Sequence, residues 1–517
     1  MEGAARAVSC ALLFFTGMSE RDLGRPIRLA LFGTFDVANY GDLLLPRIFQ
    51  REMHRRIPSA FIETFSPLGH RLPVAMAAGH LSTPLGEWTR QRRAELAASF
   101  DLIVTGGGAI LHTRDELHAE AYGTAFEEIE AIRPSRFFLD GLGEEELPGS
   151  VAWHAPGVPF DFSDEDAPWI RASLQRKAYL SVRDEPSRQR LEKLGAGCDL
   201  HVVPDSGLLV SELFESAVLE RRLRQLRALG SYPERGRPLV VQGSGAMAGQ
   251  AAAIAQAIVS LRRKLSQPMD LVLLETGSHH RDGDFADALA RALETPVYRM
   301  GDAVTIEDIA AAIAHGTALV AASMHAALTA WAFGVSWILL NTERASELDE
   351  LAALAGTSAV RDAAQLESVL ARKLTEPSRS DAGLEQSRAR LARHFDTLAM
   401  LAERAVDSRD PGQQAERDRR RIESLTLRCE ALSRAHDALR GRQAMQRSLF
   451  AEAVNDRALA NAIDENAWLR RELASLRSEL EVQRQGSDAA ARAQEELDRV
   501  RAELARVELL LRMRSEP

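Results

Sequence analysis

The feature of this 517-residue sequence that most constrains its fold is a change of pattern near residue 380. From residue 27 to about residue 340, short apolar runs alternate with amphipathic stretches, which is typical of parallel α/β domains. Beyond residue 380 the apolar runs disappear, and Arg, Glu, Ala and Leu dominate. We therefore predict an α/β region, divided into two lobes of similar size, and a long C-terminal α-helical coiled coil.

The predicted boundaries follow from where this pattern begins, changes and ends. The apolar run Val8–Phe15 is too short to cross a bilayer and lacks the basic start of a signal peptide. We expect it to belong to an extension, with Met18 as an alternative start. The predicted segments are a disordered N-terminal extension (1–26), an N-terminal α/β lobe (27–205), a C-terminal α/β lobe (206–380), a connecting helix and linker (381–413) and a coiled-coil tail (414–517).

Within the lobes, short apolar runs predict strands and longer amphipathic stretches predict helices. The expected strands are Ile27–Phe32, Asp101–Thr105, Arg136–Leu139, Val151–His154, Tyr179–Val182, Leu239–Gln242, Leu271–Leu274, Ala318–Ala321 and Trp337–Leu340. The expected helices are Leu43–Arg56, Leu117–Ile132, Glu185–Leu194, Ala251–Lys264, Phe285–Leu293, Ile306–Ala314 and Ala326–Phe333. Two such units predict a ligand site in the cleft between them.

The tail has the spacing of a coiled coil. Apolar residues recur every three or four positions, as from Leu497 to Leu511, and charged residues separate them. Asn466 at a core position would help to fix the register and the number of strands. We expect a homo-oligomer that forms through residues 414–517, and a monomeric helical hairpin is the alternative.

Composition excludes several classes of protein. The formal net charge is -10 and no basic cluster is evident, so we expect no nucleic-acid partner. Cys10, Cys198 and Cys429 lie far apart, which argues against disulfides and a zinc site and favours a reducing cytoplasm. No stretch reaches transmembrane length. We therefore expect a cytoplasmic protein, with any contact to the inner membrane being peripheral.

Two glycine loops follow predicted strands of the first lobe. Their residues are Asn39, Gly41 and Asp42 in one loop and Gly106, Gly107 and Gly108 in the other. Bare backbone at a strand end lets a ligand approach closely, and a following helix offers N–H groups to an anion. The spacing is not that of a dinucleotide fingerprint. The alternatives are a tight turn with Asp42 as a helix cap, and close packing of neighbouring loops.

Charged and polar residues follow further strands. Arg183 can bind a carboxylate or phosphate with two hydrogen bonds, and Asp184 can hold its guanidinium or cap the next helix. The alternative for this pair is a surface ion pair that contributes little. In the second lobe His325 opens a helix, whose dipole favours a neutral imidazole, although a single histidine is more often structural.

Gly243, Ser244 and His280 also follow strands of the second lobe, and we include them as substrate-binding candidates. His279 and His280 resemble a metal cluster only superficially, because adjacent side chains point in different directions and no third ligand is evident. We therefore expect no metal site.

Taken in order, these motifs resemble the polysaccharide pyruvyl transferase family. The resemblance spans roughly residues 27–340. The matching residues are Asn39 to Asp42, Asp101 to Gly108, Arg183 and Asp184 with Ser187, Leu191 and Gly195, then Asp205, and finally His325 with Ala330, Gly334 and Val335.

The resemblance implies two Rossmann-like lobes in the manner of glycosyltransferase-B folds. It implies transfer of pyruvate from phosphoenolpyruvate, as a ketal, to a sugar of a cell-surface polysaccharide precursor, with no cofactor. His325 becomes the candidate acid, which protonates the methylene carbon, and Asp42 the candidate base. Loops from both lobes would form a small positive pocket for the donor. The implied partners are phosphoenolpyruvate, a glycan acceptor that is free or lipid-linked, and a polysaccharide assembly complex.

One position departs from the family. Many members have an arginine two residues before the histidine, which the resemblance assigns to the donor anion, and this chain has Ser323 there. Ser323 stays a candidate donor contact, Arg183 becomes the chief cation, and Arg281 a second one. Two alternatives stay open. One is a glycosyltransferase or sugar-nucleotide enzyme, although no carboxylate for a ribose is evident in the second lobe. The other is a non-catalytic binding head on a coiled-coil scaffold.

Overall fold

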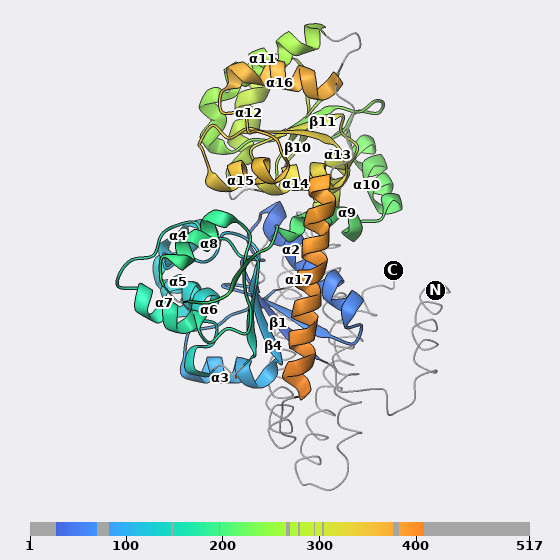
Figure 1. The fold of residues 1–517 in the computed structure, drawn as a ribbon. Helices are drawn as coiled ribbons and strands as arrows, with labels where there is room; N and C mark the ends of the chain where they lie inside the picture. Colours follow the sequence, from blue (N-terminus) through green and yellow to red (C-terminus); the bar gives the residue numbers. More distant parts are fainter. Residues whose placement is uncertain are drawn as a thin grey trace, which may run out of the picture.

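The computed structural model describes residues 27–69, 82–145, 149–195, 197–264, 269–277, 280–293, 295–301, 304–375 and 382–407. The predicted N-terminal extension and the predicted coiled-coil tail lie outside the described residues. The described part forms two α/β lobes, one above the other in Figure 1, and a long helix that runs beside both.

The first lobe is built on a parallel sheet with the strand order β3-β2-β1-β4-β5. β1 and β4 are buried along their whole length, which is why they read as continuous apolar runs. The strands are β1 (Arg28–Phe32), β2 (Phe61–Ser66), β3 (Thr83–Pro84), β4 (Leu102–Gly106) and β5 (Val151–His154), with the separate parallel pair β6 (Leu180–Val182) and β7 (Leu200–Val202). The helices are α2 (Tyr40–Arg56), α3 (Arg90–Ser99), α4 (Asp115–Tyr122), α5 (Phe126–Ile132), α6 (Pro134–Asp140), η1 (Gly143–Glu145), α7 (Ala167–Leu174) and α8 (Glu185–Glu192).

The second lobe repeats this topology in the order β10-β9-β8-β11-β12, again with parallel strands. The strands are β8 (Leu239–Val241), β9 (Leu271–Leu274), β10 (Tyr298–Met300), β11 (Ala318–Ala321) and β12 (Ser336–Leu339). The helices are η2 (Ser206–Leu209), α9 (Val210–Leu213), α10 (Ser216–Ala228), η3 (Gly245–Gln250), α11 (Ala251–Lys264), α12 (Asp282–Leu293), α13 (Ile306–Ala314), α14 (Met324–Ala332), α15 (Ser346–Leu354) and α16 (Ala363–Thr375). Both sheets have the Rossmann strand order, which confirms the predicted α/β class.

The structure confirms most of the predicted strands and helices and corrects two. The predicted strand Arg136–Leu139 lies in α6, because Pro134 occupies the first turn of a helix and a short apolar run has no diagnostic period. The predicted helix Leu117–Ile132 is two helices, since Gly123 adopts a φ of 57° and ends α4. The strands β2, β3, β7 and β10 were not predicted from the sequence.

Helix α17 (Ala382–Asp407) crosses from the second lobe back along the first, the orange helix of Figure 1. Buried histidines mark its contact with the first lobe. Nε2 of His394 lies 2.8 Å from Nδ1 of His154 at the end of β5, and Nδ1 of His394 lies 3.0 Å from the hydroxyl of Tyr179. No described helix is long and apolar enough to cross a membrane.

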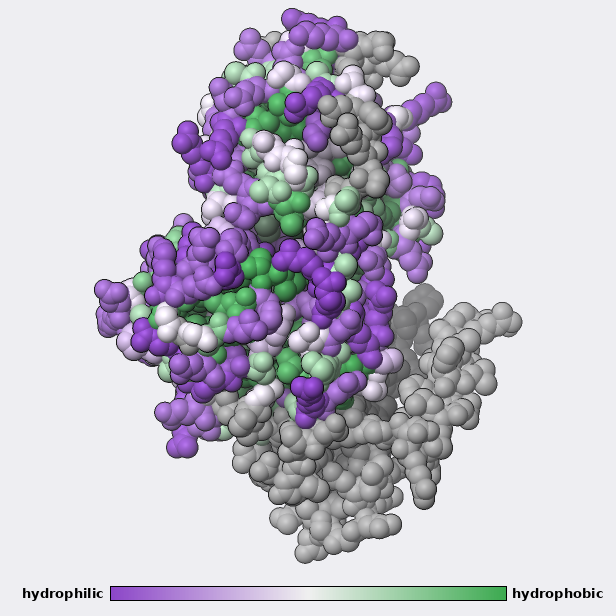
Figure 2. Space-filling model, viewed as in Figure 1, coloured by the Kyte–Doolittle hydropathy of each residue, from purple (hydrophilic) through white to green (hydrophobic). Residues whose placement is uncertain are grey.

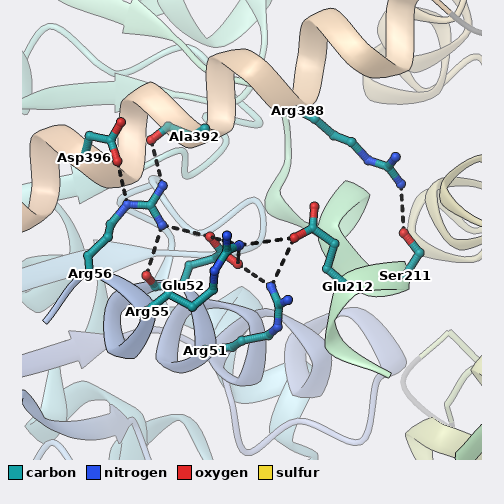
Figure 3. Close-up of polar contacts among 9 residues, drawn as sticks. All are labelled: Arg51, Glu52, Arg55, Arg56, Ser211, Glu212, Arg388, Ala392 and Asp396. Carbon is teal, nitrogen blue, oxygen red and sulfur yellow. Dashed lines mark hydrogen bonds and ion pairs between the residues drawn. The ribbon is translucent and has the colours of Figure 1, made fainter. Parts of the chain in front are cut away.

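An ion cluster links α17 to α2 (Figure 3). The side chain of Glu52 in α2 is 3% exposed and accepts hydrogen bonds from three arginines of the same helix, Arg51, Arg55 and Arg56. Arg56 also donates to Asp396 of α17, with Nε and Oδ1 2.7 Å apart. One buried carboxylate therefore organises the cations between the two helices.

The same cluster reaches the segment that connects the lobes. Glu212 of α9 accepts hydrogen bonds from Arg51 and Arg55 at 3.3 and 3.2 Å (Figure 3). Arg388 of α17 donates to the hydroxyl of Ser211 at 2.8 Å. Polar contacts of α9 therefore reach both α2 of the first lobe and α17.

Candidate active site between the two lobes

The two lobes enclose a cleft where the strand order of each sheet changes direction. In parallel α/β sheets ligands bind at this point, beyond the carboxyl ends of the strands. The loops after β1, β4, β8 and β11 border a cavity of about 630 Å³, and the surface in Figure 2 is hollowed between the lobes. The predicted site residues that border it are Asn39, Asp42, Gly108, Arg183, Ser244, His280, Ser323 and His325.

Helix α2 of the first lobe begins in this cleft and contacts the second lobe directly. Asn39 is its N-cap, and its backbone forms an antiparallel bridge with Gly277 after β9. The backbone N–H of Tyr40 donates to the carbonyl of Thr276 at 2.7 Å. The helix cap is therefore Asn39, not Asp42, and the start of α2 is shared by both lobes.

His325 lies against Gly41 of that helix. A Cβ at Gly41 would lie 2.1 Å from Nδ1 of His325, so the imidazole occupies space that only glycine leaves open. Nε2 of His325 lies 3.5 Å from Oδ2 of Asp205, the residue before η2. Ser323 caps α14 and accepts a hydrogen bond from the backbone N–H of Ala326 at 3.3 Å. The imidazole is therefore positioned by residues of both lobes.

Asp205 is ionised beside this imidazole. Burial raises the pKa of Asp205, but the positive charge and hydrogen bond of His325, the charge of Arg183 and the N–H of Gly207 outweigh it and lower that pKa to about 2. Nε2 of His325 therefore faces an ionised carboxylate, and the imidazole lies at the edge of the cavity, where a general acid has to stand.

Asp42 lies in the first turn of α2 and borders the same cavity. Burial raises its pKa, and the hydrogen bond from Thr34 at 2.7 Å and the charge of His325 oppose this effect. Gly108, with a φ of 71°, brings the second glycine loop close, since a Cβ there would lie 3.4 Å from Oδ1 of Asp42. A raised pKa makes the carboxylate of Asp42 a stronger base than an exposed one.

Arg183 is the only guanidinium among the described residues that border the cavity. Its side chain is 8% exposed, and Nε lies 3.0 Å from Oδ2 of Asp184. Asp184 also caps α8, because its other oxygen accepts from the N–H of Ser187 at 2.9 Å. Asp184 therefore performs both of the roles considered for it, and the pair is not an exposed surface ion pair.

The other predicted site residues support the cleft without bordering its cavity. They are Gly41, Gly106, Gly107, Asp184 and Gly243. A Cβ at Gly106 would lie 2.7 Å from Cβ of His154, and one at Gly243 would lie 2.6 Å from the ring of Phe285. Close packing, the alternative considered for the second glycine loop, therefore accounts for Gly106.

Gln242, the first residue after β8, holds the turn that leads to His325. The sequence pattern predicted where Gln242 lies but not this role. Its Oε1 accepts hydrogen bonds from the N–H groups of Ala322 and Ser323 at 3.0 and 2.8 Å. Its Nε2 donates to Oδ2 of Asp282 at 2.9 Å. The Ser323 turn is therefore fixed by buried polar contacts.

The charges around the cavity differ from the positive pocket that the donor chemistry predicts. Arg281, the second cation candidate, is 78% exposed and paired with Asp284. The carboxylates that border the cavity are Asp42, Glu120, Glu343 and Glu347. Glu343 and Glu347 come from the segment around the start of α15, which was not predicted to be part of the site. Carboxylates therefore outnumber guanidinium groups around this cavity.

Comparison with known proteins gives a family and distant structural relatives. A family model described as polysaccharide pyruvyl transferase matches residues 39–344, and no curated protein matches the sequence. Similar solved structures include a putative UDP-N-acetylglucosamine 2-epimerase from Listeria monocytogenes (10% identity, TM-score 0.42, 72% of this chain and 98% of that chain). Others are the UDP-GlcNAc 2-epimerase from Neisseria meningitidis (12%, 0.41, 71% and 99%) and the wall teichoic acid polymerase TagF (9%, 0.38, 76% and 92%).

Proposed function

The chain belongs to the polysaccharide pyruvyl transferase family, and we propose that it transfers pyruvate from phosphoenolpyruvate, as a ketal, to a sugar of a cell-surface polysaccharide precursor. The observation that carries this proposal is the convergence of three groups in one cleft. They are the guanidinium of Arg183, the pair formed by His325 and Asp205, and the carboxyl of Asp42. Together they offer an anion contact, an acid and a base.

In the proposed reaction Arg183 holds an anionic group of the donor. His325 gives a proton to the methylene carbon, which makes the adjacent carbon electrophilic. Two hydroxyls of one sugar bond to that carbon, and its bond to the phosphate oxygen breaks. Asp42 accepts the proton of one hydroxyl and passes it to the departing phosphate, and the proton of the other hydroxyl restores the acid form of His325. Asp205 keeps the imidazole in its orientation.

Thermal unfolding of the full chain tests donor binding. At about ten times its Kd, phosphoenolpyruvate should stabilise the folded state by ~1.4 kcal/mol, and Arg183→Ala should abolish this effect. Arg188→Ala is the matched control, because Arg188 pairs with Glu185 and Glu192 on the same helix and does not border the cavity. A response that survives in Arg183→Ala contradicts the assigned donor contact.

The position of Ser323 provides a gain-of-function test. Ser323→Arg restores the arginine found in many family members at the edge of the cavity. If the donor is phosphoenolpyruvate, we expect its affinity to rise about tenfold, the size of a charge-assisted contact of ~1.4 kcal/mol. Ser323→Ala controls for loss of the helix cap. An unchanged affinity argues against a donor anion at this position.

One observation favours a second candidate, transfer from a sugar nucleotide. The second lobe contributes Glu343 and Glu347 to the cavity, and a carboxylate there can bind ribose hydroxyls. The same thermal-unfolding assay with UDP-sugars separates the two. Stabilisation by a UDP-sugar alone, lost in Glu347→Gln, supports this second candidate.

We also propose that the enzyme acts in the cytoplasm and self-associates through residues 414–517. Sedimentation velocity of the full chain, compared with a chain ending at residue 413, tests the second statement. Equal association states contradict it.

A further inference from the structure

Tyr40, the first residue of α2, belongs to the first lobe but makes its polar contacts with the second. The residue is completely buried, and burial raises the pKa of its phenol. Its hydroxyl therefore keeps its proton and can donate a hydrogen bond. The backbone N–H of Tyr40 donates to the carbonyl of Thr276, and its hydroxyl lies 3.0 Å from Oγ1 of Thr329 in α14. The proposed reaction gives this residue no role.

A first chain of hydrogen bonds runs from the hydroxyl of Tyr40 to the backbone of His325. Oγ1 of Thr329 donates to the carbonyl of His325, one turn earlier in α14, at 2.8 Å. A hydroxyl group has only one hydrogen to donate. Since the hydrogen of Thr329 is used in this bond, Tyr40 must be the donor to Thr329. The first lobe therefore holds the carbonyl of His325 through one intervening side chain.

A second chain starts at the backbone N–H of Tyr40 and approaches His325 from the other side. Oδ2 of Asp282 accepts hydrogen bonds from the N–H and the Oγ1 of Thr276 at 2.8 and 2.7 Å. The same oxygen accepts from Gln242, whose Oε1 holds the turn that leads into α14. The two chains therefore reach the backbone just before His325 and at His325 itself.

The two lobes also meet here without room for adjustment. The ring of His325 lies against Gly41, the residue after Tyr40, and a Cβ at Gly277 would lie 2.1 Å from the carbonyl oxygen of Ala38. Close packing of this kind transmits small displacements instead of absorbing them. A shift of α2 against the second lobe would therefore also shift the histidine.

We propose that Tyr40 is a positioning residue for His325, and that its hydroxyl transmits the docking of the first lobe to this histidine. The inference rests on the proposed function, because it concerns the acid of that reaction. Tyr40 does not border the cavity, so it acts through Thr329 and not on a substrate. A general acid must lie within hydrogen-bond reach of the atom that it protonates. His325 is then in place only when the lobes are docked through Tyr40.

The variant Tyr40→Phe tests this role in the full chain, because it keeps the ring and the backbone N–H and removes only the first chain. We expect kcat, measured as acceptor-dependent release of phosphate from phosphoenolpyruvate, to fall about tenfold through misplacement of the acid. KM for phosphoenolpyruvate should stay unchanged, because Arg183 is not affected. The ¹⁵N resonances of His325, assigned by their loss in His325→Gln, should shift.

Tyr232→Phe is the matched control. Tyr232 is also completely buried, and its hydroxyl donates to the carbonyl of Ala312 at 3.2 Å. It does not border the cavity. Its loss should leave kcat and the resonances of His325 unchanged. An equal fall of kcat in both tyrosine variants would overturn the inference, because a general loss of stability would then be the cause.

Variants of Thr329 test the chain itself. Thr329→Val has nearly the same shape and lacks the hydroxyl, so it should lower kcat at least as much as Tyr40→Phe. The double variant should be no slower than Thr329→Val, because both changes break one chain. Thr329→Ser keeps the hydroxyl and should turn over faster than Thr329→Val. Additive losses in the double variant would overturn the chain.

The outcomes separate this inference from the proposed function. A wild-type kcat in Tyr40→Phe overturns the positioning role, and so does a lower kcat with unmoved resonances of His325. If the wild type releases no phosphate from phosphoenolpyruvate, the proposed function fails, and the resonances alone decide on Tyr40. A shift in Tyr40→Phe that is absent from Tyr232→Phe then supports the coupling, and no shift overturns it.

Discussion

A single methyl group at Gly41 would test how strictly the imidazole of His325 must be placed. In Gly41→Ala the new Cβ would lie 2.1 Å from Nδ1, 2.4 Å from Cε1 and 2.5 Å from Cγ of His325, whereas ordinary contacts begin near 3.4 Å. The whole ring must therefore move by about 1 Å. Such a displacement of a catalytic group costs about 10²-fold in rate, or ~2.7 kcal/mol of transition-state stabilisation.

The fold should tolerate this change. Gly41 lies inside α2 and does not have a positive φ, and alanine is the better helix former by about 1 kcal/mol. We expect kcat, measured as acceptor-dependent release of phosphate from phosphoenolpyruvate, to fall about 10²-fold, with an unfolding midpoint within a few degrees of the wild type. The ¹⁵N resonances of His325 should also shift, because the ring leaves Asp205.

Gly249→Ala is the matched control, because no atom lies within 4 Å of a Cβ built there. It should leave kcat unchanged. Turnover within threefold of the wild type in Gly41→Ala, despite shifted His325 resonances, would refute the assigned role of this histidine. Unchanged resonances would instead refute the close contact between Gly41 and the ring.

Three further predictions concern stability and pH. Glu52→Gln removes the buried carboxylate of the arginine cluster in Figure 3, so we expect the free energy of unfolding in urea to fall by about 1–3 kcal/mol; the exposed Glu403→Gln should change it little. Burial holds the pKa of His394 well below its ordinary value of 6.5, so the unfolded chain binds this proton more readily. Stability should then fall as the pH drops below about 6.5, and a fall of equal steepness in His394→Phe would contradict the assignment. The pKa of Asp205 is held at about 2, below its ordinary value of 3.8, so its charge should stabilise the fold above about pH 4, and this contribution should be lost as the pH falls toward 2; an equally steep loss of stability over this range in Asp205→Asn would show that the carboxylate beside His325 is not its source.

Much of the fold could be predicted from the sequence because it depends on local patterns. The apolar run Leu271–Leu274 and the amphipathic stretch Ile306–Ala314 form the strand and helix that they predict, with the same bounds. The secondary structure of segments without a clear hydrophobic period was harder to predict. The run in α6 reads as a strand, because four apolar or mixed residues fit either structure, and only the packing around Pro134 and its neighbours decides between them.

The sequence also identified the loops of the site, since each follows an apolar run and precedes a helix. Both roles considered for Asp184 could be predicted, but the contacts that position most of the other site residues could not. The contact between Gly41 and His325 joins residues of different lobes, and the network of Gln242 joins three strand-end loops. Contacts between residues that lie far apart along the chain leave no periodic pattern in the sequence.

Most of the elements and the order of the motifs could be read from the amino-acid sequence alone, because strand and helix periods and glycine turns are local properties. Which side chains share the cleft, and with what charge, depends on how the two lobes pack. This packing brought Glu343 and Glu347 into a pocket expected to be positive. Burial and electrostatics depend on neighbours that are distant in sequence, and these become adjacent only when the two lobes pack together.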